Sequence, residues 1–322
     1  MMFYMVTPML AVSIGFSVSS NSWMTIWMGM EINLIMFLIL NFKSKNMFTS
    51  ESSMKYFLIQ SLGSLFILIS LSTNNLIYEN WPLPDMYSIP LAMMLKSGLA
   101  PLHSWTPPII SKMSYINIFL FLTMQKIIPL MVCFCSWMNI LMLSCLANVI
   151  LGSLGGITQS SLIKIMIFSS INNSGWMIMS LSQSFSLFIM FFSSYTILTL
   201  VLMYWLYKTQ LKWIIQIKMT DLNTKFSIYS TMMSLSGLPP LLGFFPKWMI
   251  INYMFNKMIY TTSLMIITSV MMMFFYIKMA MTSMFMFNLS LKNKSNLKQL
   301  LFFNSIPLAI NCSGAFMFFI LT

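Results

Sequence analysis

Long apolar runs alternate along this chain with short breaks rich in polar residues, proline and lysine. A helix that crosses a bilayer needs roughly 20 predominantly apolar residues, and these runs reach that length with few charges. The pattern therefore predicts an all-α, polytopic membrane protein with about eleven transmembrane helices. The predicted spans are 3–20, 23–41, 55–75, 86–103, 114–136, 138–157, 161–183, 185–207, 227–252, 258–285 and 299–321.

The lysines between the spans fall almost entirely in every second loop. The odd-numbered loops hold only Lys257, and the loop after the third span carries Glu79 and Asp85. Because lysine-rich loops stay on the inner side of a membrane, the amino terminus is predicted inside and the carboxyl terminus outside. The even-numbered loops hold Lys43, Lys45, Lys112, Lys208, Lys212, Lys218, Lys225, Lys292, Lys294 and Lys298.

A short sequence recurs in two of the spans, with proline at its end. Units of five spans place the two copies in opposite directions across the membrane, and inverted repeats with broken helices recur among transporters. We therefore expect broken helices in spans 4 and 9, a first five-helix repeat over 1–136, an inverted second repeat over 137–290 and a last helix over 291–322. The two copies are Ser97-Gly98-Leu99-Ala100-Pro101 and Ser236-Gly237-Leu238-Pro239-Pro240.

Composition excludes a soluble domain and narrows the chemistry. Hydrophobic residues make up 58% of the 322 positions and charged residues 7%, whereas soluble proteins carry about 25% charged residues. The net charge of +12 does not indicate nucleic acid, because the lysines are spread between apolar runs instead of gathering on one face. Neither a Gly-rich phosphate loop nor a metal-type cysteine spacing occurs, so we expect no cofactor or metal in this chain.

Four ionisable residues fall inside predicted spans: Glu31, Lys96, Lys126 and Lys247. Each costs about 2.5–3.5 kcal/mol at the bilayer centre, so each must face protein, water or a counter-ion. A desolvated lysine binds its proton less tightly, and a nearby carboxylate strengthens that binding, so moving the carboxylate switches the lysine between holding and releasing a proton. One carboxylate and three lysines suit a proton relay better than a sodium site, which needs more oxygen ligands.

Structural roles compete with a relay role at each of these positions. A buried carboxylate can simply pair two helices, a long lysine can extend to the interface, and proline kinks are common in membrane helices. Proline near Lys96 and Lys247 nevertheless frees backbone groups that water or protein must satisfy, which favours a hydrated path. His103, the only histidine, follows Pro101 and is a candidate relay residue or a structural hydrogen-bond donor.

Four motifs in this order resemble the antiporter-like subunit 2 family of respiratory complex I, the proton-pumping NADH:quinone oxidoreductase. They span nearly the whole chain, and the last is the most specific. The motifs are Met28-Gly29-Met30-Glu31-Ile32-Asn33, then Lys96 to Trp105, then Gln125-Lys126-Ile127-Ile128-Pro129, and then Ser236 to Trp248 with Gly237-Leu238-Pro239-Pro240 and Pro246-Lys247-Trp248.

The resemblance implies a coupling glutamate at Glu31, broken-helix lysines at Lys96 and Lys247, and a connecting lysine at Lys126. It implies protons moving from the matrix through linked half-channels, with NADH, flavin, iron–sulfur and ubiquinone chemistry in other subunits. The implied partners are other membrane-arm subunits, including antiporter-like ones, and lipids such as cardiolipin, without nucleic acid. The 38 methionines and the absence of arginine match a product of an animal mitochondrial gene. The first lysine is Lys43, so no cleavable targeting signal is expected, and the chain is predicted to lie in the mitochondrial inner membrane.

Two departures from the family pattern matter. About three amino-terminal helices of the fourteen-helix pattern are absent, and Asn173 stands where the family often has histidine. Asparagine does not titrate near neutral pH, so water must carry that link if the path uses it. A passive scaffold of the membrane arm and a stand-alone cation/proton antiporter remain alternative readings of the same residues.

Overall fold

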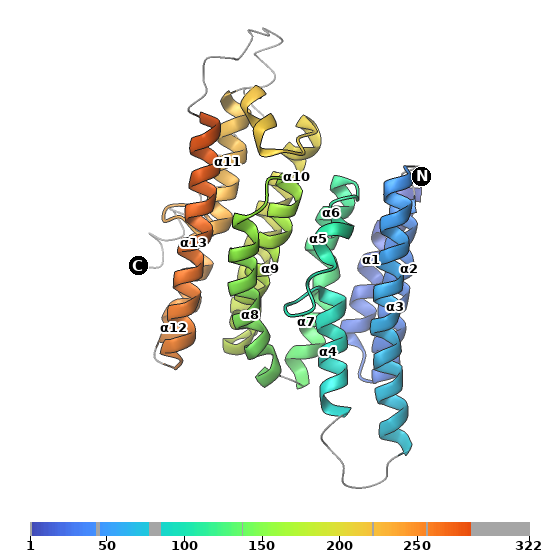
Figure 1. Cartoon of the computed structure of the whole chain (residues 1–322). Coiled ribbons are helices and arrows are strands. Elements are labelled where there is room, and N and C mark those ends of the chain that lie inside the picture. The colour runs from blue at the N-terminus through green and yellow to red at the C-terminus, as the bar shows by residue number, and fades with distance from the viewer. Residues whose placement is uncertain are drawn as a thin grey trace. The chain divides into compact units, whose positions relative to one another are not determined.

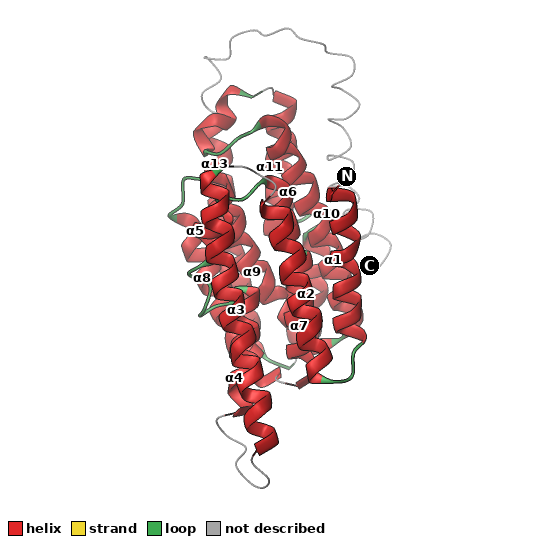
Figure 2. Ribbon diagram, turned by 90° about the vertical axis from the view of Figure 1, so that its right-hand side faces the viewer, coloured by secondary structure: helices red, strands yellow, loops and turns green. Residues whose placement is uncertain are grey.

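The computed structural model describes residues 2–42, 46–76, 85–136, 138–220, 222–255 and 257–284. The chain divides into two compact units, Met1–Ser144 and Cys145–Thr322. Every labelled element is a helix (Figure 1). The described part contains only one β-bridge, between Ser161 and Trp213, and Figure 2 shows helices joined by loops and turns.

The first unit is a bundle in which α1 packs on α2, and α3 packs on both α2 and α4. An aromatic cluster joins the helices and consists of Phe37, Tyr56, Trp105 and Phe121. The ring centroids are 5.1 Å apart for Phe37 and Tyr56 and 5.8 Å apart for Trp105 and Phe121. Such aromatic groups bury large apolar areas and fix the helices around them. The helices are α1 (Met2–Ser19), α2 (Trp23–Phe42), α3 (Met47–Leu76), α4 (Asp85–Ser97), α5 (Thr106–Ile110), α6 (Tyr115–Leu122) and α7 (Met124–Ser136).

The second unit is built around α9, which is buried along almost its whole length. A Cβ atom at Gly152 would lie 2.6 Å from the Asn172 nitrogen, so glycine allows α8 to pack directly against the α9 backbone. Helix α10 contacts α9, α11 and α12, and α13 contacts α11. The elements are α8 (Met138–Ile157), α9 (Leu162–Gln183), α10 (Phe185–Thr209), the 3-10 helix η1 (Ile214–Met219), α11 (Leu222–Ser236), α12 (Phe244–Phe255) and α13 (Ile259–Met284).

Every predicted span except the last corresponds to described helix, and the last, 299–321, lies outside the described residues. Spans 4 and 9 are broken, as predicted, between α4 and α5 and between α11 and α12. Span 5 also breaks, at Thr123, whose hydroxyl and backbone nitrogen both bond to the Phe119 carbonyl. Such a bond from a side chain to the preceding turn bends helices, and this break was not predicted from the sequence. Six stretches in the described residues are long and apolar enough to cross a membrane; the chain is an all-helical, multi-pass membrane protein.

Contacts between loops agree with the predicted alternation of sides within each unit. In the first unit, Glu51 accepts from Lys112 at 2.7 Å, which joins the loops after spans 2 and 4. In the second unit, the Leu162 nitrogen donates to the Lys212 carbonyl at 2.9 Å, which joins the start of α9 to the turn after α10. At the other end of α9, the side chain of Gln183 accepts a hydrogen bond from Lys257 at 2.9 Å. Each of these contacts joins helix ends or turns that the predicted map places on the same side.

Candidate functional site

The two helix breaks share one local structure. In the first, Leu99 N–H bonds to the Met94 carbonyl at 3.0 Å and Gly98 N–H to the Leu95 carbonyl at 3.3 Å. This is the Schellman ending of a helix, which requires a left-handed residue, and Gly98 supplies it with a φ of +67°.

The second break repeats this ending at Ser236-Gly237-Leu238. Leu238 N–H bonds to the Met233 carbonyl at 3.2 Å and Gly237 N–H to the Ser234 carbonyl at 3.1 Å, and Gly237 has a φ of +92°. The repeated Ser-Gly-Leu sequence therefore encodes the same helix stop twice. In each case the last two helical carbonyls still need a hydrogen-bond donor.

Lys96 lies in the last turn of α4, directly before the first break, and is 5% exposed. Its Nζ lies 3.9 Å from Oε1 of Glu31 on α2, whose side chain is 27% exposed. The predicted carboxylate–lysine pair is therefore present in the structure. The separation is long for a direct hydrogen bond, and Glu31 Oε1 is a buried atom that has no hydrogen-bond partner among the described residues.

Two residues of α3 hold Lys96 in place. Gln60 donates from Nε2 to the Lys96 carbonyl at 2.9 Å, which satisfies one of the carbonyls left open by the break. A Cβ atom at Gly63 would lie 2.9 Å from Cγ of Lys96, so only glycine lets the lysine stem lie flat on α3. Gln60 was not predicted from the sequence, although a glutamine in the middle of an apolar span indicates a polar partner.

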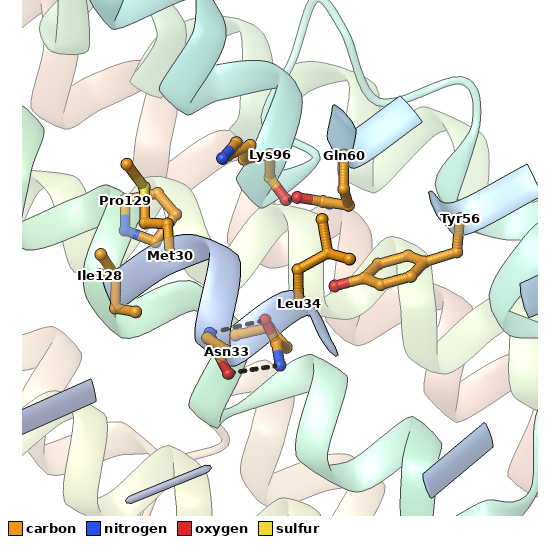
Figure 3. A pocket seen from close by; sticks show the side chains of 9 residues that line it. Met30, Asn33, Leu34, Tyr56, Gln60, Lys96, Ile128 and Pro129 are labelled. Atoms are coloured by element: carbon orange, nitrogen blue, oxygen red, sulfur yellow. Dashed lines mark hydrogen bonds between the residues drawn. The ribbon is translucent and has the colours of Figure 1, made fainter. Parts of the chain in front are cut away.

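Figure 3 shows a small cavity beside Lys96, Gln60 and Asn33. It has room for an ordered water molecule and several polar groups to bind one. Asn33 on α2 and Gln125 on α7 line it and bond to each other in both directions, at 3.0 and 3.1 Å. Lys126 follows Gln125 and is 3% exposed.

His103 lies in the turn between α4 and α5, is half-buried, and has its Nδ1 3.3 Å from the Pro101 carbonyl. Its backbone carbonyl accepts from both the nitrogen and the hydroxyl of Thr106, at 3.0 and 2.8 Å. These bonds tie the turn to the start of α5. A relay role for His103 stays a prediction.

Lys247 lies in the first turn of α12, after the second break, and is 5% exposed. Its Nζ reaches back and donates to the carbonyls of Leu235 and Ser236, at 3.0 and 2.9 Å. These are the two carbonyls that the Schellman ending leaves open. The negative end of the α11 dipole therefore stabilises the ammonium group, and the ring of Trp176 faces it at 5.4 Å.

A second small cavity adjoins Lys247 within the second unit. It is lined by Asn173 of α9, Tyr195 and Ser194 of α10, and Ser234 of α11, among others. Asn173 is buried and lines this cavity together with Lys247. Its amide can bind water as donor and acceptor but cannot carry a proton by titrating near neutral pH.

The predicted site residues thus lie in both units, with Glu31, Lys96, His103 and Lys126 in the first and Lys247 in the second. Among the described residues there is no group of three or more His, Cys, Asp or Glu that could hold a metal. The chemistry available at these positions is proton binding, proton release and hydrogen bonding to water.

The transmembrane family model "NADH:quinone oxidoreductase/Mrp antiporter, TM" matches residues 20–273. The chain is 36% identical to NADH-ubiquinone oxidoreductase chain 2 of Anopheles gambiae, over 92% of this chain and 89% of that one. It is 34% identical to the chain 2 protein of Locusta migratoria, over 84% and 82%. With the Canis lupus protein the identity is 31%, over 81% and 79%.

Solved structures show the same fold at low sequence identity. A chain of respiratory complex I from Thermus thermophilus matches with a TM-score of 0.82 at 17% identity, over 98% of this chain and 78% of that one. A chain of the Mrp complex from Dietzia matches with a TM-score of 0.72 at 14% identity, over 85% and 59%. By its sequence relatives and its family match, the chain belongs to the NADH:quinone oxidoreductase/Mrp antiporter family and, within it, to the NADH-ubiquinone oxidoreductase chain 2 proteins.

Proposed function

We propose that this chain moves protons through the membrane arm of respiratory complex I by a relay of Glu31, Lys96, Lys126 and Lys247. As a chain 2 protein, it is a proton-translocating membrane subunit of the NADH:ubiquinone oxidoreductase complex. The observation that carries the proposed relay is the Glu31–Lys96 pair, 3.9 Å apart at the end of a broken helix and beside a cavity that can hold water.

The pair suits a switch because its two members differ in exposure. Lys96 is almost fully buried, whereas the Glu31 side chain is 27% exposed and so has freedom to move or to gain a proton. When Glu31 is charged and near, it stabilises the Lys96 ammonium. When Glu31 is neutral or turned away, the buried ammonium loses this support and releases its proton to water in the cavity.

Lys126 and Lys247 continue the relay in this proposal. Lys247 holds its proton against the carbonyls of Leu235 and Ser236 and loses it to water in the cavity beside Asn173. Water, not the Asn173 side chain, then carries the proton past that position. His103 is a further candidate relay residue, at the turn that joins α4 to α5.

The proposal includes the finer architecture predicted from the sequence. Eleven spans and two inverted five-helix repeats, 1–136 and 137–290 with a last helix in 291–322, are supported by the repeated helix stop at Gly98 and Gly237. The loop contacts within each unit support the alternation of sides. We place the chain in the mitochondrial inner membrane, with its amino terminus in the matrix and its carboxyl terminus in the intermembrane space.

Electron transfer belongs to other subunits in this proposal, with NADH, flavin, iron–sulfur clusters and ubiquinone bound there and no cofactor in this chain. Its partners are other membrane-arm subunits, including antiporter-like ones, and lipids such as cardiolipin. Apolar side chains exposed along α1, α3 and α13, for example Val12, Leu58 and Phe274, provide surface for lipid or neighbouring helices.

Proton pumping measured against NADH oxidation tests the relay. Membrane vesicles carry the complex with Glu31→Gln or Lys247→Ala, and native gels establish how much complex assembles. We expect assembled variant complex to move fewer protons per NADH or to turn over more slowly. Unchanged pumping and turnover in both variants would assign these charges a structural role and leave a scaffold as the function.

A further inference from the structure

Asn33 and Gln125 form a closed pair of hydrogen bonds that was not predicted from the sequence. Asn33 Nδ2 donates to Gln125 Oε1 at 3.0 Å, and Gln125 Nε2 donates back to Asn33 Oδ1 at 3.1 Å. The two residues are 92 positions apart and only 4% and 8% exposed. Each amide thereby uses one donor and one acceptor on the other amide.

Both amides are close in the chain to members of the proposed relay. Asn33 is two residues from Glu31 on α2, and Gln125 directly precedes Lys126 on α7. Both amides line the cavity that also contacts Lys96 and Gln60. Figure 3 shows Asn33 below Lys96, with dashed lines for the two hydrogen bonds that Asn33 makes. Helix α7 begins directly after the break at Thr123, so Gln125 lies where the span is least regular.

We infer that the Asn33–Gln125 pair, the amide latch, gates proton transfer by water between Lys96 and Lys126. In the closed state the two amides bond to each other and not to water, and the cavity holds too little water for a continuous chain of water molecules. Open, each amide frees one donor and one acceptor, which is enough to hold a further water molecule.

The transfer itself needs no other reactant. A proton leaves the Lys96 ammonium for a water molecule, and that water chain gives a proton to the neutral amine of Lys126, so the water is regenerated. The amides do not titrate; they position water. This inference rests on the proposed relay function.

Two substitutions at Asn33 should act in opposite ways if the latch exists. Asn33→Ala removes the latch, leaves Gln125 free to bind water and enlarges the cavity. NADH oxidation should then continue while the protons moved per NADH fall, because the path stays hydrated. Asn33→Leu fills the space with apolar atoms, so NADH turnover of coupled vesicles should fall about fivefold to tenfold, as expected when a hydrogen-bonded site is lost.

Asn41 provides a matched control on the same helix. It is buried and accepts a hydrogen bond from Asn117 at 2.7 Å, but neither residue lines the cavity. Asn41→Ala and Asn41→Leu disturb the packing in the same way and should leave the protons per NADH unchanged. If an Asn33 variant does not assemble, Gln125→Ala and Gln125→Leu make the same test from the other helix.

All values are taken per assembled complex, and Lys126→Ala is measured in the same vesicles. If Lys126→Ala lowers pumping while Ala and Leu at the latch both leave pumping and turnover at control values, the latch is wrong and the relay stands. The gating role is also contradicted if alanine and leucine at the latch change the protons per NADH and the NADH turnover in the same direction. Changes no larger than those of the Asn41 variants would contradict it as well. If Lys126→Ala also has no effect, the relay itself fails.

Discussion

The two broken helices end in the same way, but different groups contact the lysine at each break. Both stop at a Ser-Gly-Leu sequence with a left-handed glycine. In the first unit, a neutral amide from Gln60 satisfies the Lys96 carbonyl, and the lysine amine is left to pair with Glu31. In the second unit, the lysine itself satisfies the helix end, and among the described residues no carboxylate forms an ion pair with Lys247.

This difference separates two ways of keeping a charge inside a membrane. Lys96 depends on a partly exposed carboxylate that can move, whereas Lys247 depends on fixed carbonyls and the aromatic face of Trp176. The first arrangement is switchable by a single side chain. The second makes the lysine a structural part of the break, so its removal should disturb both the fold and the proton path.

The largest expected effect is at Gly243, where the second break closes on α11. A Cβ atom there would lie 1.8 Å from the Ser234 carbonyl oxygen, and a backbone atom cannot move aside as a side chain can. Gly243→Ala should destabilise the second unit by about 1–3 kcal/mol or more and reduce the assembled complex on native gels. Gly15→Ala is the control, because nothing lies within 4 Å of a Cβ atom there; equal assembly of both variants would contradict this close approach.

Lys247→Ala should cost more stability than Lys96→Ala. It leaves the carbonyls of Leu235 and Ser236 without a donor, which should cost about 1–3 kcal/mol for the two together. Lys96→Ala leaves the Gln60 bond to the backbone intact. Thermal melting of the purified complex compares the two, and a larger loss in Lys96→Ala would show that the carbonyl contacts of Lys247 are unimportant.

Gln60→Met should have an intermediate effect, because the Lys96 carbonyl then loses its donor while the side-chain volume is nearly kept. We expect a loss of about 1–2 kcal/mol and slower NADH-driven pumping as the end of α4 shifts. Leu58→Met on the same helix is the control, since Leu58 is exposed to the surroundings of the unit. A wild-type pumping rate and melting temperature in Gln60→Met would show that Gln60 does not contribute to the site.

The smallest effect on stability is expected for Glu31→Gln. The ion pair is 3.9 Å long with one partly exposed member, so its loss should change stability by less than about 1 kcal/mol. The same variant should nevertheless impair pumping, which separates function from folding at this position. A large loss of assembled complex would instead make Glu31 a structural partner of α4.

Most of the helices and both repeated helix breaks could be predicted from the sequence, because membrane spans and helix stops are encoded locally. Apolar length and lysine alternation predicted the helices, and the paired Ser-Gly-Leu sequences marked both breaks. The break at Thr123 was missed because it arises from a side-chain bond to the preceding turn. The charges at Glu31 and Lys96 stood out in apolar runs, and their pairing follows from the fold.

The supporting residues could not be predicted, since their partners are distant in the chain. Gln60 meets Lys96 across 36 positions, and Asn33 meets Gln125 across 92. A polar residue within an apolar span signals some partner, but periodicity does not reveal which one. The backward reach of Lys247 likewise depends on how α12 folds against α11 after Gly243.

The central claim is that Lys247 carries protons and does not merely close a helix end. Lys247→Gln tests it directly, because glutamine keeps hydrogen-bond donors for Leu235 and Ser236 but cannot titrate. Lys257→Gln is the matched control, a surface lysine that donates to Gln183 at 2.9 Å. In vesicles with equal amounts of assembled complex, the account predicts fewer protons per NADH, or slower turnover, in Lys247→Gln alone. Wild-type pumping and turnover in Lys247→Gln would contradict it.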